Sequence, residues 1–369
     1  MIRWLRFLGL GLLATSTVRA FSSPAFGSRS SSEGRTAAAS ILQVQVQVTD
    51  IGSLQIDASS VGQSSEEAAT PPPPPPLNTY PEMPEDLVHC MSASEWRQRC
   101  ELAASYRIAY LHDWHENIFN HITTKLEGTS DEKDGPHFLL NDFGIGFDEI
   151  TACNLLKVTL DGCVVDCNIP PERRTVNPGE GRVFKPGYVL HSAIHGSRHD
   201  VNTIWHGHDL DATAVSQTKF GILPLSQEAT FTIAKGISYH PFEGSVNSLD
   251  EQSRLVANLG PTNQILMLED HGPIVACKST EEAFAGMYFL TRACQFQVKS
   301  LSAAGGDLGR IHVPDDGALE EMKVRADKFD EAPQRRDEEK AREHDTPGLM
   351  FAYARRSAER HFGPGDIYR

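Results

Sequence analysis

The stretch Asp200-Val-Asn-Thr-Ile-Trp-His206-Gly-His208 decides the fold prediction, because it joins a short strand pattern to a pair of histidines. Residues 203–208 are typical of a β-strand, so we expect the side chains of His206 and His208 to leave the same face. Two neutral imidazoles on one face can chelate a divalent metal such as zinc. Taken alone, a His-x-His pair more simply indicates a structural role.

A third histidine follows another apolar strand pattern. His271 lies in Leu268-Glu-Asp-His-Gly272, directly after an expected strand over residues 264–268, and Gly272 lets the chain turn there. Three histidines that leave a fourth coordination position open are the pattern of a catalytic zinc site. The sequence therefore predicts a metal site formed by His206, His208 and His271.

A competing cluster lies on a helix expected from residue 188 to about residue 198. Its histidines, His191, His195 and His199, follow i, i+4, i+8 spacing and could also bind a metal. This helix carries no carboxylate that could orient the rings. We therefore favour the interpretation that this histidine face packs on the sheet.

The flanking segments indicate an α/β fold. Ser92 with Glu95, and Ser279 with Glu282, are capping-box patterns that predict helices to about residues 112 and 303. Strands are expected over residues 138–140, 157–160 and 163–165, the last two joined by the hairpin signal at residues 161–162. Antiparallel strands with long helices predict a sheet that helices cover.

The overall charge excludes several classes of protein. The chain has 369 residues, with 34 Lys and Arg against 49 Asp and Glu, and a net charge of −15. Such acidity argues against binding to the phosphate backbone of nucleic acid. We find no apolar stretch of the roughly 18 residues that a transmembrane helix needs. The seven scattered cysteines are not a disulfide scaffold and favour a reducing compartment.

The N-terminal residues predict a targeting leader. In residues 1–20, Arg3 and Arg6 precede a short apolar run, as in a signal peptide, and residues 21–40 have the Ser/Arg-rich composition of a transit peptide. The combination resembles the bipartite leaders of algae with secondary plastids and predicts plastid localisation. Simple secretion is the alternative, as is a cytoplasmic or cytoskeletal location if the leader does not function.

The rest of the chain divides into three expected parts. Residues 41–84 include six consecutive prolines and are predicted to be a disordered linker. Residues 85–313 are the expected folded domain. Residues 314–369 are a charged extension whose terminal segment regains apolar spacing, so we expect that segment to pack against a neighbour.

Several ordered motifs together resemble the class II aldolase/adducin family, over about residues 90–313. The matching segments are residues 120–125 (NHITTK), 149–152 (EITA), 191–195 (HSAIH), 200–208, 214–228, 269–272 (EDHG) and 294–306. The last of these resembles the adducin head in particular.

The resemblance implies a three-layer α/β/α domain with a mostly antiparallel central sheet, which commonly assembles as a homo-tetramer. It also implies that His206, His208 and His271 match, one for one, the zinc-binding histidines of the family's sugar-phosphate aldolases. In the same way, His121, Thr123 and Gly144 fall where those aldolases hold the substrate or its phosphate.

Two departures from the family pattern argue against ordinary cleavage of a sugar phosphate. The aldolases carry an acid/base Glu where this chain has Gly187, and glycine cannot transfer a proton. Their phosphate-binding Ser pair is replaced by Lys185-Pro186, in which Lys185 either attracts an anion or is a solvated surface residue. Glu228 is the alternative acid/base candidate by analogy, with a structural carboxylate as the competing interpretation.

Two functions from different classes follow. The first is a divalent-metal, most simply zinc, lyase that performs aldol cleavage, decarboxylation or epimerisation on a small oxygenated or sugar-like substrate. The second is a non-catalytic adducin-like scaffold for oligomer assembly, actin filament binding and cytoskeleton organisation. Adducins end in a lysine-rich segment, and the last residues before Arg369 contain no basic run. We therefore expect the enzyme.

Overall fold

The computed structural model describes residues 79–130, 135–165, 169, 183–244, 249–330 and 345–369. The chain divides into two units, Met1–Pro71 and Pro72–Arg369, and all described residues belong to the second. The predicted signal peptide, the transit-like segment and the linker up to residue 78 lie outside the described residues.

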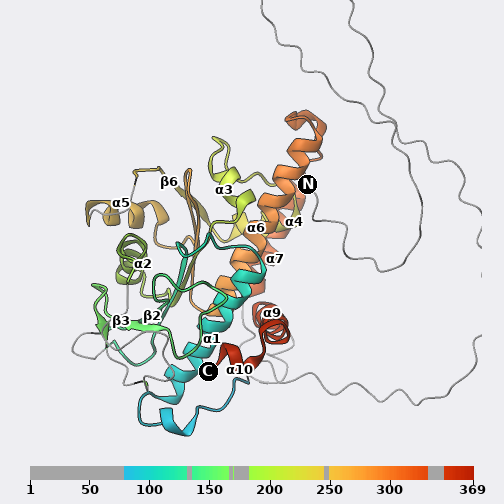
Figure 1. Cartoon of the computed structure of the whole chain (residues 1–369). Coiled ribbons are helices and arrows are strands. Elements are labelled where there is room, and N and C mark those ends of the chain that lie inside the picture. Colours follow the sequence, from blue (N-terminus) through green and yellow to red (C-terminus); the bar gives the residue numbers. More distant parts are fainter. Residues whose placement is uncertain (1–78, 131–134, 166–168, 170–182, 245–248, 331–344) are drawn as a thin grey trace, which may run out of the picture. The chain divides into compact units, whose positions relative to one another are not determined.

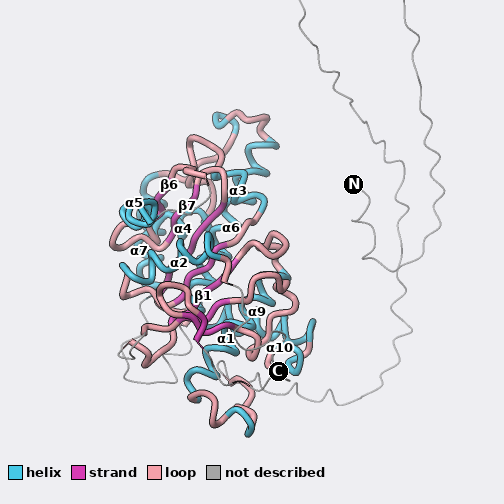
Figure 2. Tube along the Cα trace, turned by 60° about the vertical axis from the view of Figure 1, so that its left-hand side comes forward, coloured by secondary structure: helices cyan, strands magenta, loops and turns pink. Residues whose placement is uncertain are grey.

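An eight-stranded sheet runs through the centre of the domain (Figure 2). Its order is β4-β3-β2-β1-β5-β8-β7-β6, and every neighbouring pair is antiparallel except β6–β7. The strands are β1 His121–Lys125, β2 Phe138–Leu140, β3 Leu156–Val158, β4 Val164–Val165, β5 Thr203–His206, β6 Ile237–His240, β7 Ile265–Leu268 and β8 Gly272–Cys277. The mostly antiparallel sheet is confirmed.

Helices cover both faces of this sheet (Figure 1). On one face lie α2 and α5; on the other α1, α3 and α6 contact the strands, and α9 packs behind α1 and α6. The helices are α1 Ala93–Leu111, α2 Lys185–Ser197, α3 Leu210–Ser216, α4 Gln227–Ala234, α5 Leu249–Leu259, α6 Thr280–Ala303, α7 Asp316–Asp330, α9 Thr346–Phe362 and α10 Pro364–Ile367, with 3-10 turns at Glu85–Leu87 and Leu308–Arg310. The three-layer α/β/α prediction is confirmed.

The alternation of side chains in β5 divides the core between the two faces. Ile204 packs in a cluster with Leu190 and Ile194 of α2, whereas Trp205 belongs to the larger cluster beneath α1 and α6. By the period of two, His206 points to the same face as Ile204. The α2 face of the sheet therefore carries the histidine.

The predicted helix ends are close to those observed. Ser92 and Ser279 are the N-caps of α1 and α6, and each side chain accepts a hydrogen bond from the backbone N–H three residues on. Helix α2 begins at Lys185, earlier than expected, because Pro186 suits the first turn of a helix. Strand β5 ends at His206, two residues before the predicted end.

The two ends of the described chain pack against the same helices. Arg355 of α9 donates to the carbonyl of Thr79 at 2.6 Å, and Trp96 of α1 donates to the carbonyl of Pro81 at 2.9 Å. The ring of Tyr80 lies 6.3 Å, edge to face, from that of Tyr368. Residues 79–84, which we expected to close the linker, thus contact the domain.

Within the described part of the chain, no helix combines the length and apolar character that crossing a membrane requires.

Candidate metal centre

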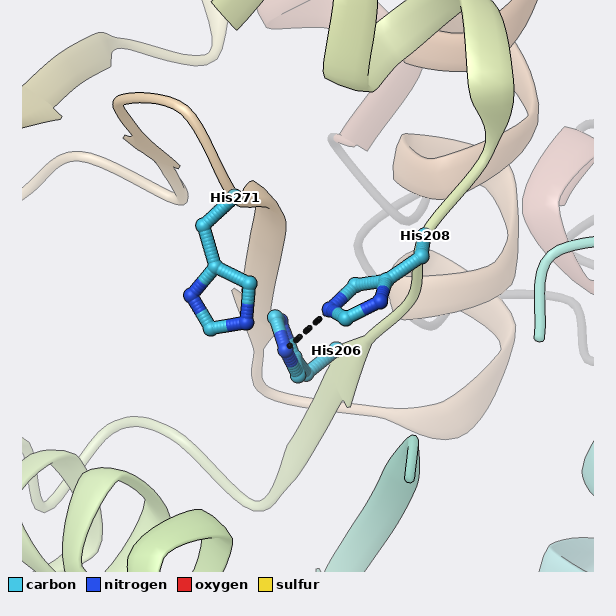
Figure 3. Close-up of side chains that lie close together, drawn as sticks. All are labelled: His206, His208 and His271. Carbon is cyan, nitrogen blue, oxygen red and sulfur yellow. Dashed lines mark hydrogen bonds between the residues drawn. The ribbon is translucent and has the colours of Figure 1, made fainter. Parts of the chain in front are cut away.

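Three histidines converge between the end of β5 and the turn that joins β7 to β8 (Figure 3). His206, His208 and His271 each offer a ring nitrogen, and these three atoms lie within 4.8 Å of one another. The centroids of their rings are 4.8 to 4.9 Å apart. The structure therefore brings together the three residues that the sequence predicts as metal ligands.

Gly207 explains why His208 joins the cluster although it lies beyond the strand. A Cβ atom at this position would lie 2.6 Å from the carbonyl oxygen of Trp114 and 2.8 Å from Cε of Met287. The backbone N–H of His208 donates to the same Trp114 carbonyl at 3.0 Å. The chain is thus pressed against Trp114 at a point where only glycine fits, and the His208 ring is directed toward His206.

A tight turn positions His271. Its backbone N–H donates to the carbonyl of Leu268 at 3.2 Å, and Asp270 within the turn has a φ of 57°. A Cβ atom on Gly272 would lie 2.8 Å from the carbonyl oxygen of Gly207. The two loops that carry the histidines therefore approach each other because both contain glycine at the contact.

Hydrogen bonds on the outer side of the cluster determine the tautomers of two rings. His206 Nδ1 lies 3.0 Å from the carbonyl oxygen of Pro273, and His208 Nδ1 lies 2.6 Å from Glu116 Oε2. A carbonyl and a carboxylate only accept, so each neutral ring carries its proton on Nδ1. Each Nε2 is then a bare lone pair. The two Nε2 atoms are 3.1 Å apart, an arrangement that a shared cation would stabilise.

Burial keeps the rings of His206 and His271 neutral. It lowers the pKa of His206 well below 6.5, and the neighbouring His208 and His271 lower it further. Burial, followed by the neighbouring His208, lowers the pKa of His271 to about 4, against the opposing effect of Glu116. Neutral imidazole is the form that binds metal, so the donor set fits a divalent ion at neutral pH.

The histidines of α2 have a different role. His121 Nδ1 lies 2.6 Å from His191 Nε2, His191 Nδ1 lies 2.6 Å from Thr123 Oγ1, and that oxygen lies 2.9 Å from His195 Nε2. We call these four buried residues the β1–α2 chain. Protein groups occupy both nitrogens of His191, so neither nitrogen is left for a metal ion. The histidine face of α2 packs on the sheet, as the sequence indicated, and His199 is not part of the β1–α2 chain.

The other predicted site residues lie in different places. His121 pairs with His206 across β1 and β5, with their ring centroids 5.2 Å apart, whereas Thr123 is enclosed in the β1–α2 chain. Lys185 lines an open cavity beside the β3–β4 hairpin that none of the three metal-site histidines lines.

Gly144 has a φ of 105° in the loop after β2, and Glu228 lies in the first turn of α4. Among the described residues, the cluster that could hold a metal ion does not include Glu228.

A small cavity adjoins His121. Its walls are mostly apolar and aromatic, and the rings of Phe143 and Phe184 stack with centroids 4.5 Å apart. Asn120 also lines it, and the side-chain Nδ2 of this residue is buried without a hydrogen-bond partner. The cavity therefore contains an unpaired amide donor, that of Asn120, within a mostly apolar surround.

Sequence reasoning missed two parts of the site. Glu116, which orients His208, is separated from it by 92 residues and carries no local motif. The space beside Gly187 was also missed: a Cβ atom there would lie 1.9 Å from His121 Nε2. The sequence shows that a side chain is lacking at position 187, but only the structure shows which residue fills its place.

Comparison with known proteins identifies the family. The chain matches the Class II Aldolase and Adducin N-terminal domain over residues 100–298. It is 41% identical over 232 residues to a Pseudomonas aeruginosa protein assigned by its name to aldolase class 2, covering 63% of this chain and 81% of that protein. It is 40% identical over 209 residues to rat alpha-adducin, covering 56% of this chain but only 26% of the adducin.

Solved structures show the same likeness. An aldolase II superfamily protein from Pseudomonas syringae superimposes with a TM-score of 0.62 and 33% identity, over 74% of this chain and 97% of that one. L-fuculose 1-phosphate aldolase from Glaciozyma antarctica has a TM-score of 0.58 at 18% identity, over 79% of this chain and 98% of that one, and shares the fold. The chain therefore belongs to the class II aldolase and adducin family.

Proposed function

We propose that the protein is a divalent-metal-dependent lyase that acts on a small oxygenated or sugar-like substrate. The observation that carries this proposal is the pair of bare Nε2 atoms of His206 and His208, 3.1 Å apart, with His271 beside them. Two lone pairs in that position repel each other unless a cation or proton lies between them. The likeness to proteins whose names place them among the class II aldolases supports the same assignment.

Zinc bound by three histidines supplies Lewis-acid polarisation of a carbonyl oxygen. His206, His208 and His271 would hold the ion, while Pro273 and Glu116 keep two of the rings in the metal-binding tautomer. Asn120 offers a donor to a substrate oxygen in the adjoining cavity. Aldol cleavage, decarboxylation and epimerisation all develop negative charge beside a carbonyl, so this arrangement suits each of them.

Metal analysis of the purified full chain tests the proposal. We expect about one zinc per chain in the wild type after reconstitution, and loss of most of it in His206→Ala, because two imidazoles bind far more weakly than three. His199→Ala is the matched control, since this exposed histidine lies outside the cluster. A reconstituted wild type that holds no divalent metal would rule out the enzyme.

A substrate panel narrows the reaction. Zinc-loaded wild type is offered small hydroxy-aldehydes, hydroxy-acids and sugar phosphates, and products of cleavage, decarboxylation and epimerisation are followed separately. Turnover that is lost in His206→Ala identifies the class. We expect weak turnover of phosphorylated substrates, since the described residues that line the cavity beside His121 include stacked aromatic rings and no lysine or arginine.

The adducin-like scaffold is the second candidate, and the 40% identity to rat alpha-adducin over 209 residues favours it. Co-sedimentation with actin filaments distinguishes the two roles, because a scaffold pellets with filaments whether or not it holds zinc.

Either role is compatible with a homo-oligomer, and we propose a tetramer, which sedimentation velocity would measure. Plastid targeting is a further proposal, tested by fusing residues 1–84 to a fluorescent protein.

A further inference from the structure

His121 occupies the space that a side chain at position 187 would need. A Cβ atom on Gly187 would lie 1.9 Å from His121 Nε2 and 2.4 Å from Cδ2, which no real contact allows. The His121 ring is buried, and its centroid is 5.2 Å from that of His206. Gly187 in α2 and His121 in β1 are therefore complementary. Because position 187 has no side chain, the His121 ring can lie beside the histidine cluster.

The β1–α2 chain links the tautomer of His121 to those of two other rings. A neutral imidazole has one N–H and a threonine one O–H. A proton on the free nitrogen of His195 therefore makes the three hydrogen bonds of the chain all point from His121 toward His195, and a proton on His121 Nε2 makes them all point the other way. If they point from His121 toward His195, then Nδ1 of His121 is protonated and Nε2 is bare. If they point the other way, Nε2 carries the proton instead.

Two observations favour the first direction. At the far end, His195 Nδ1 is buried without a hydrogen-bond partner, and the backbone of Val201 raises the pKa of this ring as a nearby acceptor does, which favours a proton on Nδ1. At the near end, His206 and His208 also donate through Nδ1 and leave Nε2 bare. An N–H dipole directed at a cation held by those rings would be unfavourable.

We propose that His121 Nε2, kept bare by the β1–α2 chain, is the hydrogen-bond acceptor for a substrate N–H or O–H group at the three-histidine centre. His121 thereby supplies the polar group that Gly187 lacks. Thr123, His191 and His195 are positioning residues that fix its tautomer. This inference rests on the proposed function, because it places the substrate at the metal centre.

A double-mutant cycle tests the steric part. Gly187→Ala is expected to lower the Tm by at least about 5 °C, and adding His121→Ala should recover part of that loss, because it removes the ring that the new Cβ meets. Gly196→Ala in the same helix is the control, since its nearest neighbour would be Leu160 at 3.7 Å. Equal stability of Gly187→Ala and wild type would contradict the pairing.

Hydroxamate binding tests the acceptor. Zinc-loaded full chain is titrated calorimetrically with acetohydroxamate and with N-methylacetohydroxamate, which lacks the N–H group. Wild type should prefer acetohydroxamate by about tenfold, the value of one hydrogen bond. His121→Ala should lose the preference, and Thr123→Val, which keeps His121 but breaks the chain, should reduce it. His199→Ala should keep it.

The outcomes separate the two proposals. Wild type that takes up no zinc overturns the metal-dependent function and this inference together. Wild type that takes up zinc but shows no preference between the two hydroxamates, or binds neither, overturns only the role of His121. A preference that survives in both His121→Ala and Thr123→Val does the same.

Discussion

Gly187 and Gly207 carry no side chain, and in each case a neighbouring group occupies the space that a Cβ would need. At Gly207 that group is the Trp114 carbonyl, and at Gly187 it is the His121 ring. These contacts position two of the imidazoles at the site. The geometry of the candidate centre therefore depends on these two glycines as well as on the histidines.

Gly207→Ala should disturb the metal centre without changing a ligand. The added Cβ would lie 2.6 Å from the Trp114 oxygen, so the loop must shift and take His208 with it. We expect zinc affinity to fall at least about tenfold, as for other changes that misorient a ligand. A chelator competition assay measures this, and Gly365→Ala, which has open space around its Cβ, should match wild type.

The buried His195 should make the protein sensitive to acid. Burial lowers the pKa of His195 to about 3, with the charge of Lys125 adding to the effect. An unfolded histidine titrates near 6.5, so between these values the unfolded chain binds the extra proton. The contribution of His195 to the free energy of unfolding is therefore fully present above about pH 6.5, and it falls by about 1.4 kcal/mol per pH unit as the pH decreases toward 3.

Urea unfolding of His195→Gln at several pH values checks this expectation. The variant should be less stable at pH 7, because the hydrogen bond to Thr123 is disturbed. Its stability should nevertheless fall less steeply between pH 6.5 and 5 than that of wild type. Parallel curves would show that His195 is already protonated in the folded state.

Single site residues were predictable from the sequence where the residue type and its spacing indicate a metal ligand. Two histidines on one face of a strand, with a third at the end of another strand, identify candidate metal ligands, so His206, His208 and His271 could be named before the fold was known. Glu116 and the pairing of His121 with Gly187 could not, because both depend on distances across the sheet. A motif of neighbouring residues carries no information about distances between strands and helices that are far apart in the sequence.

At the scale of elements, α2 contributes to both the core and the candidate site. Its apolar residues pack on the sheet with α5, while His191 and His195 complete the β1–α2 chain. Helix α9 contributes to packing alone, since it lies against α1 and α6 with its Phe351 ring 5.9 Å from Phe284 of α6. Helix α2 thus combines packing with a part in the candidate site, whereas α9 only packs.

Phe351→Ala should test the contribution of α9. The side chain is 2% exposed, and deletion of a buried aromatic ring typically costs about 3–5 kcal/mol. We expect this loss in chemical denaturation, with little change in the zinc bound per folded chain. Tyr353→Ala in the same helix is the control, because Tyr353 is 64% exposed and its loss should be nearly neutral. Equal losses for both variants would show that α9 does not dock through Phe351.

Long capped helices and several short strands were predictable, whereas strand β8 and the short helices α3 and α4 were not. Ser92 and Ser279 mark the starts of α1 and α6 because their side chains cap the first turn. Strand β8 lies between two other strands and is buried throughout, so it shows no alternation of polar and apolar residues. Helices α3 and α4 are too short for a clear period.

For the whole molecule, the layered architecture followed from motifs spread over about two hundred residues, and their order was more informative than any one of them. The packing of the chain ends was only partly predictable. Apolar spacing near the C-terminus indicated docking, but nothing in residues 79–84 indicated that Tyr80 would meet Arg355, whose guanidinium lies 4.6 Å from the ring centroid. Contacts between distant ends depend on the completed fold.

Two truncations test the boundary of the folded unit. A chain that starts at residue 79 should unfold with the same Tm as the full-length protein. A chain that starts at residue 85 loses the contacts of Thr79, Tyr80 and Pro81 with α1 and α9, so we expect its Tm to be several degrees lower. Identical melting curves for the two truncated chains would mean that residues 79–84 contribute nothing to stability.

The order of the strands has a consequence for how the molecule folds. In the middle of the sheet, β5 pairs with β1 through Thr203 and Thr124 and with β8 through Thr203 and Cys277, so each pairing closes a long loop of chain. Loop closure of this kind slows folding. His206 and His271 meet only after β8 has joined β5, so an unfolded chain presents no ready metal site. Zinc should therefore leave the refolding rate unchanged and slow only unfolding.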